Sequence, residues 1–186
     1  MFKLCFATTL LFLTVGFAHA AEGPRALSAN FAAMDPPWDV PDLLFKDSAG
    51  QDHLLRTFLK QELKGQYVLL NIWASWCTPC SREMPSLDQL QATMESRNLA
   101  VLAVSVDHEG DVAVPAFYRR YGLSHLKFYW DRPGSSLRRL HLRGIPTTLL
   151  ISPDGKELGR ISSHIDWMRE DNLAYLNRLL DVAQKR

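Results

Sequence analysis

Two cysteines, Cys77 and Cys80, stand where an expected strand meets an expected helix, and this junction constrains the fold more than any other feature. The preceding run 67–72 is almost wholly apolar, as in a buried strand, and Leu87 and Leu90 follow at helical spacing. A helix N-terminus offers unpaired N–H groups and a partial positive charge, which stabilise a thiolate. We therefore expect Cys77 to ionise below the ~8.5 of a free thiol, and one helical turn to bring the two sulfurs together.

A Cys-x-x-Cys pair has two other common uses, as half of a zinc site or as a permanent disulfide. Zinc needs four ligands, but the chain has one other cysteine, Cys5, and no close pair of histidines, so we predict no metal site. A structural bridge across so short a loop would remove little entropy from the unfolded chain. Trp76 and Pro79 favour redox chemistry instead, and a proline suits the first turn of a helix.

The motif Trp76-Cys77-x-Pro79-Cys80 after such a strand resembles the active site of the thioredoxin superfamily. The wider string 71–85 resembles the extracytoplasmic TlpA/ResA branch, and the likeness runs from about residue 43 to the C-terminus. It implies an α/β thioredoxin fold, in which helices flank a central mixed β-sheet, with an N-terminal β-hairpin and a helix–strand insertion. It also implies a thiol–disulfide oxidoreductase: Cys77 attacks a partner disulfide, and Cys80 resolves the mixed disulfide. We expect Trp76, Thr78 and Pro79 to contact the substrate, and no cofactor beyond the cysteine pair.

The remaining elements follow from apolar periodicity and turn residues. We expect a hairpin around the turn 47–50, and serine caps at Ser135 or Ser136 and an aspartate cap at Asp166. The expected strands are 43–45, 53–55, 99–106, 126–130, 147–152 and 157–161, and the expected helices are 57–63, 78–97, 111–121, 135–141 and 167–184.

The loop 143–148 is the second chemical element. By its residues alone, Gly144 before Ile145-Pro146 indicates a turn, and an ordinary loop is the alternative. The loop resembles the thioredoxin loop in which a cis-proline faces the cysteines. That resemblance implies a cis bond before Pro146, and an Ile145 backbone that pairs with an extended substrate segment, as in strand addition.

Glu83 follows Cys80 by three residues and so lies on the same helix face. Spacing alone leaves open a solvated residue that pairs with Arg82 or a lysine. Thioredoxin places a buried acid at the position that Asn71 holds here, whereas the TlpA/ResA branch has an acid at the place of Glu83. The resemblance therefore implies a poorly solvated carboxyl group with a raised pKa, which moves the proton of Cys80.

The N-terminus has the pattern of an export signal. Lys3 gives a positive start, residues 4–17 are almost wholly apolar, and 18–20 form an Ala-x-Ala cleavage site. We expect residues 1–20 to be a cleaved signal peptide that removes Cys5, and the mature protein to be periplasmic. The alternative is a retained membrane anchor, because a span needs ~20 apolar residues and this run is only somewhat shorter.

Composition sets the domain count and the class of partner. Residues 21–38, rich in Ala and Pro, are typical of a linker or N-terminal arm, and 39–186 form one thioredoxin-like domain. A net charge of +1 gives no reason to expect nucleic acid. We expect a monomer whose partners are protein thiols and disulfides.

The resemblance also indicates the direction of the reaction. Relatives in this branch are mostly reductants that a membrane thiol-electron carrier recharges, and they act on apocytochrome c or on copper-site proteins of cytochrome oxidase. The segment 146–148 reads Pro-Thr-Thr where the apocytochrome-specific subgroup has Pro-Glu-Thr, which favours a copper-site or a general reductant. The rivals are a peroxidase, whose P-x-x-x-T-x-x-C motif is absent, and a redox-sensing domain without turnover.

Overall fold

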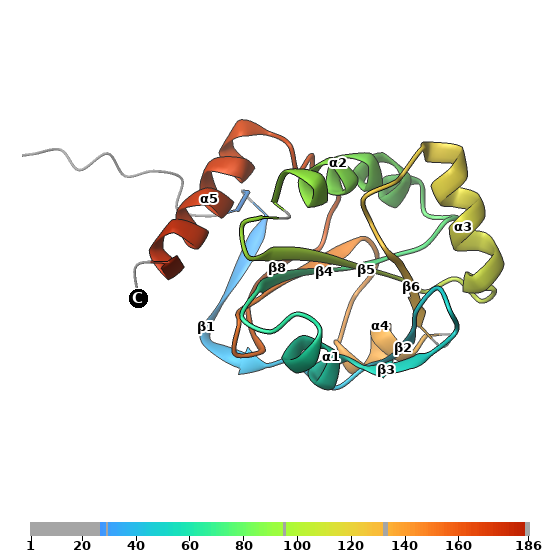
Figure 1. The fold of residues 1–186 in the computed structure, drawn as a ribbon, viewed down its shortest axis with the longest axis horizontal. Helices are drawn as coiled ribbons and strands as arrows, with labels where there is room; N and C mark the ends of the chain where they lie inside the picture. Colours follow the sequence, from blue (N-terminus) through green and yellow to red (C-terminus); the bar gives the residue numbers. More distant parts are fainter. Residues whose placement is uncertain (1–26, 29, 95, 132–133, 185–186) are drawn as a thin grey trace, which may run out of the picture.

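An eight-stranded mixed sheet forms the centre of the computed structural model, which describes residues 27–28, 30–94, 96–131 and 134–184 (Figure 1). The expected signal peptide 1–20 lies outside these residues. The strand order is β1-β8-β7-β4-β5-β6-β2-β3. The strands are β1 Phe31–Asp39, β2 Leu44–Lys46, β3 Asp52–Leu54, β4 Tyr67–Trp73, β5 Leu99–Ser105, β6 Phe128–Asp131, β7 Thr147–Ile151 and β8 Lys156–Ile161.

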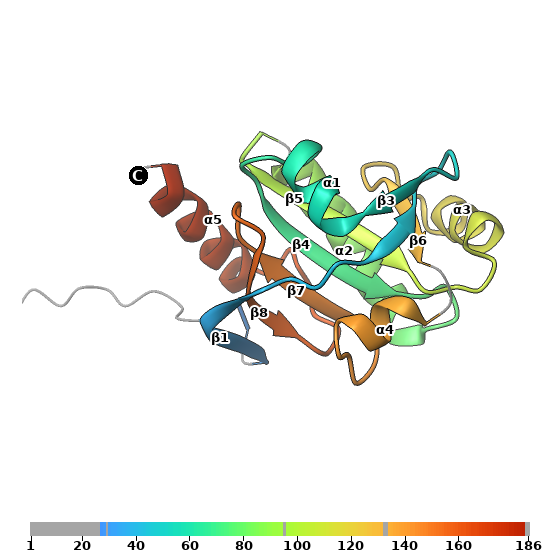
Figure 2. The same cartoon turned by 90° about the horizontal axis from the view of Figure 1, so that it is seen from below.

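Five helices of the described chain flank this sheet. They are α1 Leu55–Gln61, α2 Thr78–Met94, α3 Gly110–Tyr121, α4 Ser135–Arg139 and α5 Glu170–Gln184. Figures 1 and 2 show α2 and α5 on one face of the sheet and α1 and α4 on the other, with α3 beside β6. Together with the mixed sheet, this is the thioredoxin fold that the sequence predicts. None of the described helices is long and apolar enough to cross a membrane.

The central strands β4 and β5 run parallel, and both are buried along nearly their whole length. Parallel strands covered on both faces have apolar side chains on both faces, which explains why 67–72 is apolar without alternation. β7 pairs antiparallel with β4, so the start of β7 lies beside the end of β4. This register brings the loop before β7 to the end of the sheet where the cysteines lie.

The segment predicted as a linker or N-terminal arm contains a strand. β1 pairs antiparallel with β8 at the edge of the sheet, and its register shifts between Ala33 and Trp38. Pro36 and Pro37 lie in the segment where the register shifts. A proline has no N–H to donate to a neighbouring strand, so it is tolerated at the edge of a sheet or at a bulge. A Cβ at Gly159 would lie 2.6 Å from the carbonyl oxygen of Ala32, so the glycine allows β1 to approach β8 closely.

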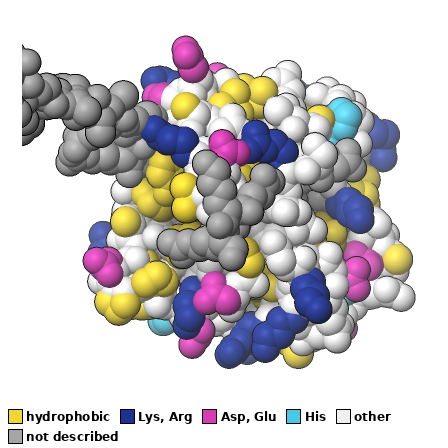
Figure 3. All heavy atoms as spheres, turned by 60° about the vertical axis from the view of Figure 1, so that its left-hand side comes forward, with side chains coloured by type: hydrophobic (Ala, Val, Ile, Leu, Met, Phe, Trp, Pro, Cys, Tyr) yellow, Lys and Arg dark blue, Asp and Glu magenta, His cyan; other side chains and the backbone are white. Residues whose placement is uncertain are grey.

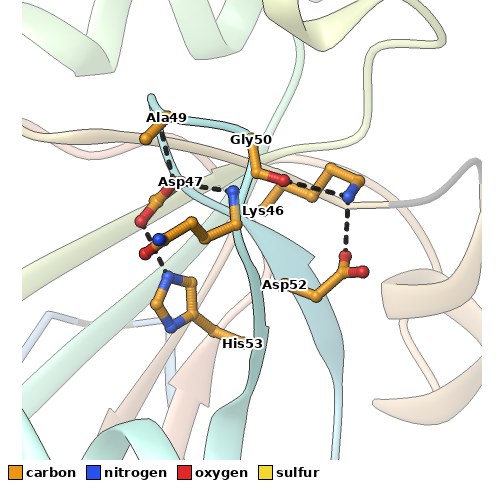
Figure 4. Close-up of polar contacts among 7 residues, drawn as sticks. Lys46, Asp47, Ala49, Gly50, Asp52 and His53 are labelled. Atoms are coloured by element: carbon orange, nitrogen blue, oxygen red, sulfur yellow. Dashed lines mark hydrogen bonds and ion pairs between the residues drawn. The ribbon is translucent and has the colours of Figure 1, made fainter.

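The β2–β3 hairpin forms as predicted and extends the sheet beyond β6. Asp47 organises its turn (Figure 4): its carboxylate accepts a 2.9 Å hydrogen bond from the Ala49 backbone N–H and lies 2.8 Å from Nε2 of His53. Lys46 forms a 2.8 Å ion pair with Asp52 across the strands. These contacts hold the hairpin turn independently of the redox site.

Two predicted helix caps are wrong. Gly134, not a serine, caps α4, and Ser136 instead donates its backbone N–H to Asp131 at 2.5 Å. α5 begins at Glu170, three residues after the predicted start, and Asp166 accepts a 2.9 Å hydrogen bond from the Met168 N–H in the turn before it. The acceptor for the Ser136 N–H is Asp131, at the end of β6. Local sequence could not indicate this contact.

Positive and negative side chains are interspersed on the face shown in Figure 3. The net charge of the whole chain is +1. Such a face gives little long-range attraction for a polyanion.

Candidate redox site

Cys77 and Cys80 form a disulfide at the N-terminus of α2. Cys77 precedes the helix, and its carbonyl accepts a 3.0 Å hydrogen bond from the Ser81 N–H. The Cys80 N–H points at the Cys77 sulfur over 3.2 Å. Cys77 keeps 6 % of its surface exposed and Cys80 none, so Cys77 is the more accessible of the two cysteines. A helix N-terminus aimed at that sulfur favours its thiolate after reduction.

Asp107 holds the loop that carries Cys77. Its carboxylate accepts hydrogen bonds from the Ser75 backbone N–H at 2.8 Å, the Ser75 hydroxyl at 2.7 Å and the Ser105 hydroxyl at 2.6 Å. In the sequence, this aspartate lies only in the connection between the expected strand 99–106 and the expected helix 111–121. Ser75 and Asp107 are 32 residues apart, and they meet because β4 and β5 are paired and end side by side. Local sequence therefore could not reveal this contact.

The loop 143–148 faces the cysteines. The Ile145–Pro146 peptide bond is cis, which confirms that expectation. The Ile145 carbonyl oxygen lies 3.8 Å from Sγ of Cys77. Thr147 braces the loop by donating its hydroxyl to the Gly144 carbonyl at 2.8 Å. The two chemical elements that the sequence singled out therefore meet at one place.

The predicted substrate residues divide into exposed and covered groups. Trp76 is 69 % exposed, and Thr78 and Pro79 are exposed beside it. Ile145 is half-buried and Pro146 is buried. Trp76, Thr78 and Pro79 are therefore accessible from solvent beside Cys77, whereas Pro146 is covered.

Glu83 is buried in the core, with 1 % of its surface exposed. The alternative of a solvated helix residue is therefore wrong. Burial raises the pKa of Glu83 from its ordinary 4.5 to about 7, and the nearby Trp167 indole, Ile165 backbone and Asn71 side chain partly oppose that rise. A carboxyl group with a pKa near neutrality can exchange a proton with a thiol under physiological conditions.

Trp167 is the partner of Glu83 that sequence reasoning missed. Its indole N–H donates to Oε1 of Glu83 at 2.6 Å, and its backbone N–H donates to Ser86 Oγ at 3.1 Å. In the sequence, Trp167 is only the first residue of the expected helix 167–184. Because 84 residues separate the two side chains, no local pattern could reveal the hydrogen bond.

Within the part of the chain that the structure describes, no group of three or more His, Cys, Asp or Glu side chains is arranged to hold a metal ion. The histidines are dispersed: His53 belongs to the hairpin turn, and His108, His125, His141 and His164 are exposed.

Comparison with known proteins agrees with this site. Residues 39–156 match the AhpC/TSA family. The ResA thiol-disulfide oxidoreductase of Bacillus subtilis is 32 % identical over 132 residues, which cover 71 % of this chain and 70 % of that protein. The ResA protein of Geobacillus thermodenitrificans is 34 % identical over 117 residues. The matched region spans 63 % of this chain and about 63 % of that relative's length.

Solved structures share the fold. A Chlorobium tepidum protein assigned as a thiol:disulfide interchange protein DsbE superposes with a TM-score of 0.62 at 26 % identity, over 79 % of this chain and 96 % of that one. A thiol-disulfide oxidoreductase from Bacteroides fragilis gives a TM-score of 0.61 at 26 % identity, over 76 % of this chain and 98 % of that one. The chain thus belongs to the AhpC/TSA family, as a thioredoxin-fold protein similar to the ResA thiol-disulfide oxidoreductases.

Proposed function

We propose that this protein is an extracytoplasmic thiol–disulfide oxidoreductase that reduces disulfides of partner proteins. The observation that carries the proposal is the Cys77–Cys80 disulfide at a helix N-terminus, 3.8 Å from the Ile145 carbonyl oxygen. A dithiol in this place can give two electrons and two protons to a partner disulfide. No cofactor is required for that exchange.

The reaction proceeds through two sulfur transfers. The Cys77 thiolate attacks one sulfur of the partner disulfide, which breaks the S–S bond and releases the other sulfur as a thiolate. Cys80 then attacks the Cys77 sulfur, re-forms the intramolecular disulfide and releases the second partner thiolate. Glu83 accepts the proton of Cys80 during this attack, since both groups lie on one buried face of α2.

The periplasm and a role in cytochrome assembly are the most specific part of the proposal. The export signal in 1–20 supports the location, and the resemblance to the TlpA/ResA branch supports apocytochrome or copper-site proteins as substrates. In an oxidising compartment the pair stays reduced only if another protein supplies electrons. A membrane thiol-electron carrier fills that need.

Turnover distinguishes this function from its rivals. The reduced protein, mixed with a disulfide-bonded peptide, should produce one peptide dithiol for each Cys77–Cys80 disulfide formed, and Cys77→Ser should produce none. A sensor or binding domain would show no such exchange under a regenerating reductant. A peroxidase would instead consume peroxide, and peroxide consumption with no peptide reduction contradicts the proposal.

The partner class has its own test. Cys80→Ala lacks the resolving sulfur, so partners should stay covalently attached to Cys77 in a periplasmic extract. Mass spectrometry of those adducts should find apocytochromes or copper-site proteins, and the double variant Cys77→Ala/Cys80→Ala should capture none. Adducts that contain neither class would contradict the assignment to cytochrome assembly while leaving the chemistry intact.

A further inference from the structure

Asn71 and Thr148 extend the buried polar contacts of Glu83 into strand β7. They are directly opposite each other on β4 and β7, and Nδ2 of Asn71 donates to Oγ1 of Thr148 at 2.8 Å. All three side chains are buried. The Asn71 side chain lies within hydrogen-bonding reach of the Glu83 carboxyl group. A chain of polar groups therefore leads from α2 to the strand that begins after Pro146.

Two atoms of these polar side chains have no hydrogen-bond partner in the part of the protein that the structure describes. Oε2 of Glu83 and Oδ1 of Asn71 are both buried without a hydrogen bond among the described residues. Both are acceptors when Glu83 is ionised, and a buried acceptor without a hydrogen bond destabilises the fold. A proton on Oε2 turns that atom into a donor, which can then bond to Oδ1.

We propose that Asn71 is a positioning residue that serves both states of Glu83 by reversing its side-chain amide. In the protonated state, Oε2–H of Glu83 donates to Oδ1 of Asn71, and Nδ2 of Asn71 donates to Oγ1 of Thr148. When the carboxyl group loses its proton, the amide turns over: Nδ2 then donates to Oε2, and the Thr148 hydroxyl donates to Oδ1.

Thr148 is suited to this exchange because a hydroxyl group both donates and accepts. Trp167 is not, since its indole N–H only donates, and it already occupies the other oxygen, Oε1. The Ile165 backbone N–H likewise only donates. Asn71 and Thr148 are therefore the groups that can adapt to both protonation states of Glu83. The inference rests on the proposed function, in which Glu83 changes protonation as Cys80 attacks.

Among the described residues, the groups that influence the pKa of Glu83 are uncharged. Cys80, three residues earlier on the same helix, is held in a disulfide and does not titrate in the oxidised protein. Burial, not a neighbouring charge, is the largest influence on the carboxyl group. The polar groups near the carboxyl group are Ile165 and Trp167, before α5, and Asn71 on β4, which is itself bonded to Thr148 on β7.

Asn71→Leu tests the inference in the oxidised protein. The variant removes the Asn71 hydrogen bond from both protonated and ionised Glu83. The ionised carboxylate loses more, because its hydrogen bond is charge-assisted and therefore stronger. The pKa of Glu83, followed by carbon NMR of its side chain, should therefore rise by about one pH unit above that of the wild type. Asn177→Leu removes a comparable amide that binds Arg97 elsewhere, and should leave the pKa of Glu83 unchanged.

A second measurement needs no change at Asn71. The side-chain amide resonances of Asn71 should shift with pH at the same midpoint as the Glu83 carboxyl group. That shift should persist in Thr148→Ser, and disappear in Glu83→Gln. An unchanged pKa in Asn71→Leu, or an Asn71 amide that ignores the Glu83 titration, overturns the inference. Both readouts use resting oxidised protein, so they are independent of whether the proposed reduction of partners occurs.

Discussion

At the scale of single residues, Glu83 connects stability to chemistry. The fold buries its carboxyl group on the same helix as Cys80, three residues further along, and raises its pKa to about 7. One oxygen of that group, Oε1, accepts a hydrogen bond from the Trp167 indole N–H. The other oxygen, Oε2, accepts none from the described residues. The site therefore keeps an acid that can be neutral or charged near neutral pH, which a proton acceptor for Cys80 must be.

Glu83→Gln should separate the two steps of the reaction. It keeps the shape of the side chain but cannot accept a proton, so attack by Cys77 should survive while resolution by Cys80 slows about 10²–10⁴-fold. In the wild type, resolution should accelerate as the pH rises through the Glu83 pKa of about 7, because the ionised carboxylate is the base. Stopped-flow tryptophan fluorescence with a preformed mixed disulfide measures both. Equal resolution rates in the two proteins across this pH range would exclude Glu83 as the base.

At the scale of elements, Asp88 on α2 forms hydrogen bonds with the connection between α3 and β6. Its buried carboxylate accepts hydrogen bonds from the backbone N–H groups of Ser124, His125 and Leu126, the last two at 2.9 Å. These groups follow the end of α3 at Tyr121, where no helix or strand supplies acceptors. The contact fixes the helix–strand insertion against the active-site helix.

Asp88→Ala should lower the free energy of unfolding by about 2–4 kcal/mol, because it leaves three backbone donors without their acceptor. Asp88→Asn keeps one acceptor oxygen and should lose less. Urea denaturation at constant pH gives the comparison, with Gln89→Ala, an exposed neighbour on the same helix, as the control. A loss no larger than that of the control would mean that Asp88 does not hold the insertion.

Local patterns predicted the elements, and long-range contacts explain what they missed. The apolar run 67–72, the helix after Cys77 and the hairpin turn 47–50 each follow from their own residues. The β1 strand did not, because Pro36 and Pro37 argue locally against a strand, and pairing with β8 overrides that preference. The cysteines, Glu83 and the cis-proline loop were found from motifs, whereas the Trp167 hydrogen bond depends on where α5 returns to α2.

At the scale of the whole molecule, the buried carboxyl group makes stability depend on pH. Burial raises the pKa of Glu83 from 4.5 in the unfolded chain to about 7 in the fold. The stabilising contribution of its proton is therefore complete below pH 4.5, and is lost as the pH rises to about 7. The loss amounts to about 3 kcal/mol.

Urea unfolding of the oxidised protein at several pH values measures this contribution. The wild type should lose about 3 kcal/mol relative to Glu83→Gln as the pH rises across that interval, and the difference should then level off. Other titrating groups, such as Asp47 in the hairpin, act equally in both proteins and cancel. Stability curves that run parallel would show that Glu83 has the same pKa in the folded and unfolded chains.

The central claim is that Cys77 starts thiol–disulfide exchange and Cys80 completes it. The most direct measurement mixes reduced protein with a disulfide-bonded peptide, quenches with acid and maps the adducts by mass spectrometry. Cys80→Ala should accumulate a peptide adduct on Cys77, Cys77→Ala should form almost none, and the wild type should pass to the intramolecular disulfide and free peptide dithiol. An adduct that forms as fast on Cys80 in Cys77→Ala, or no adduct in either variant, would contradict the account.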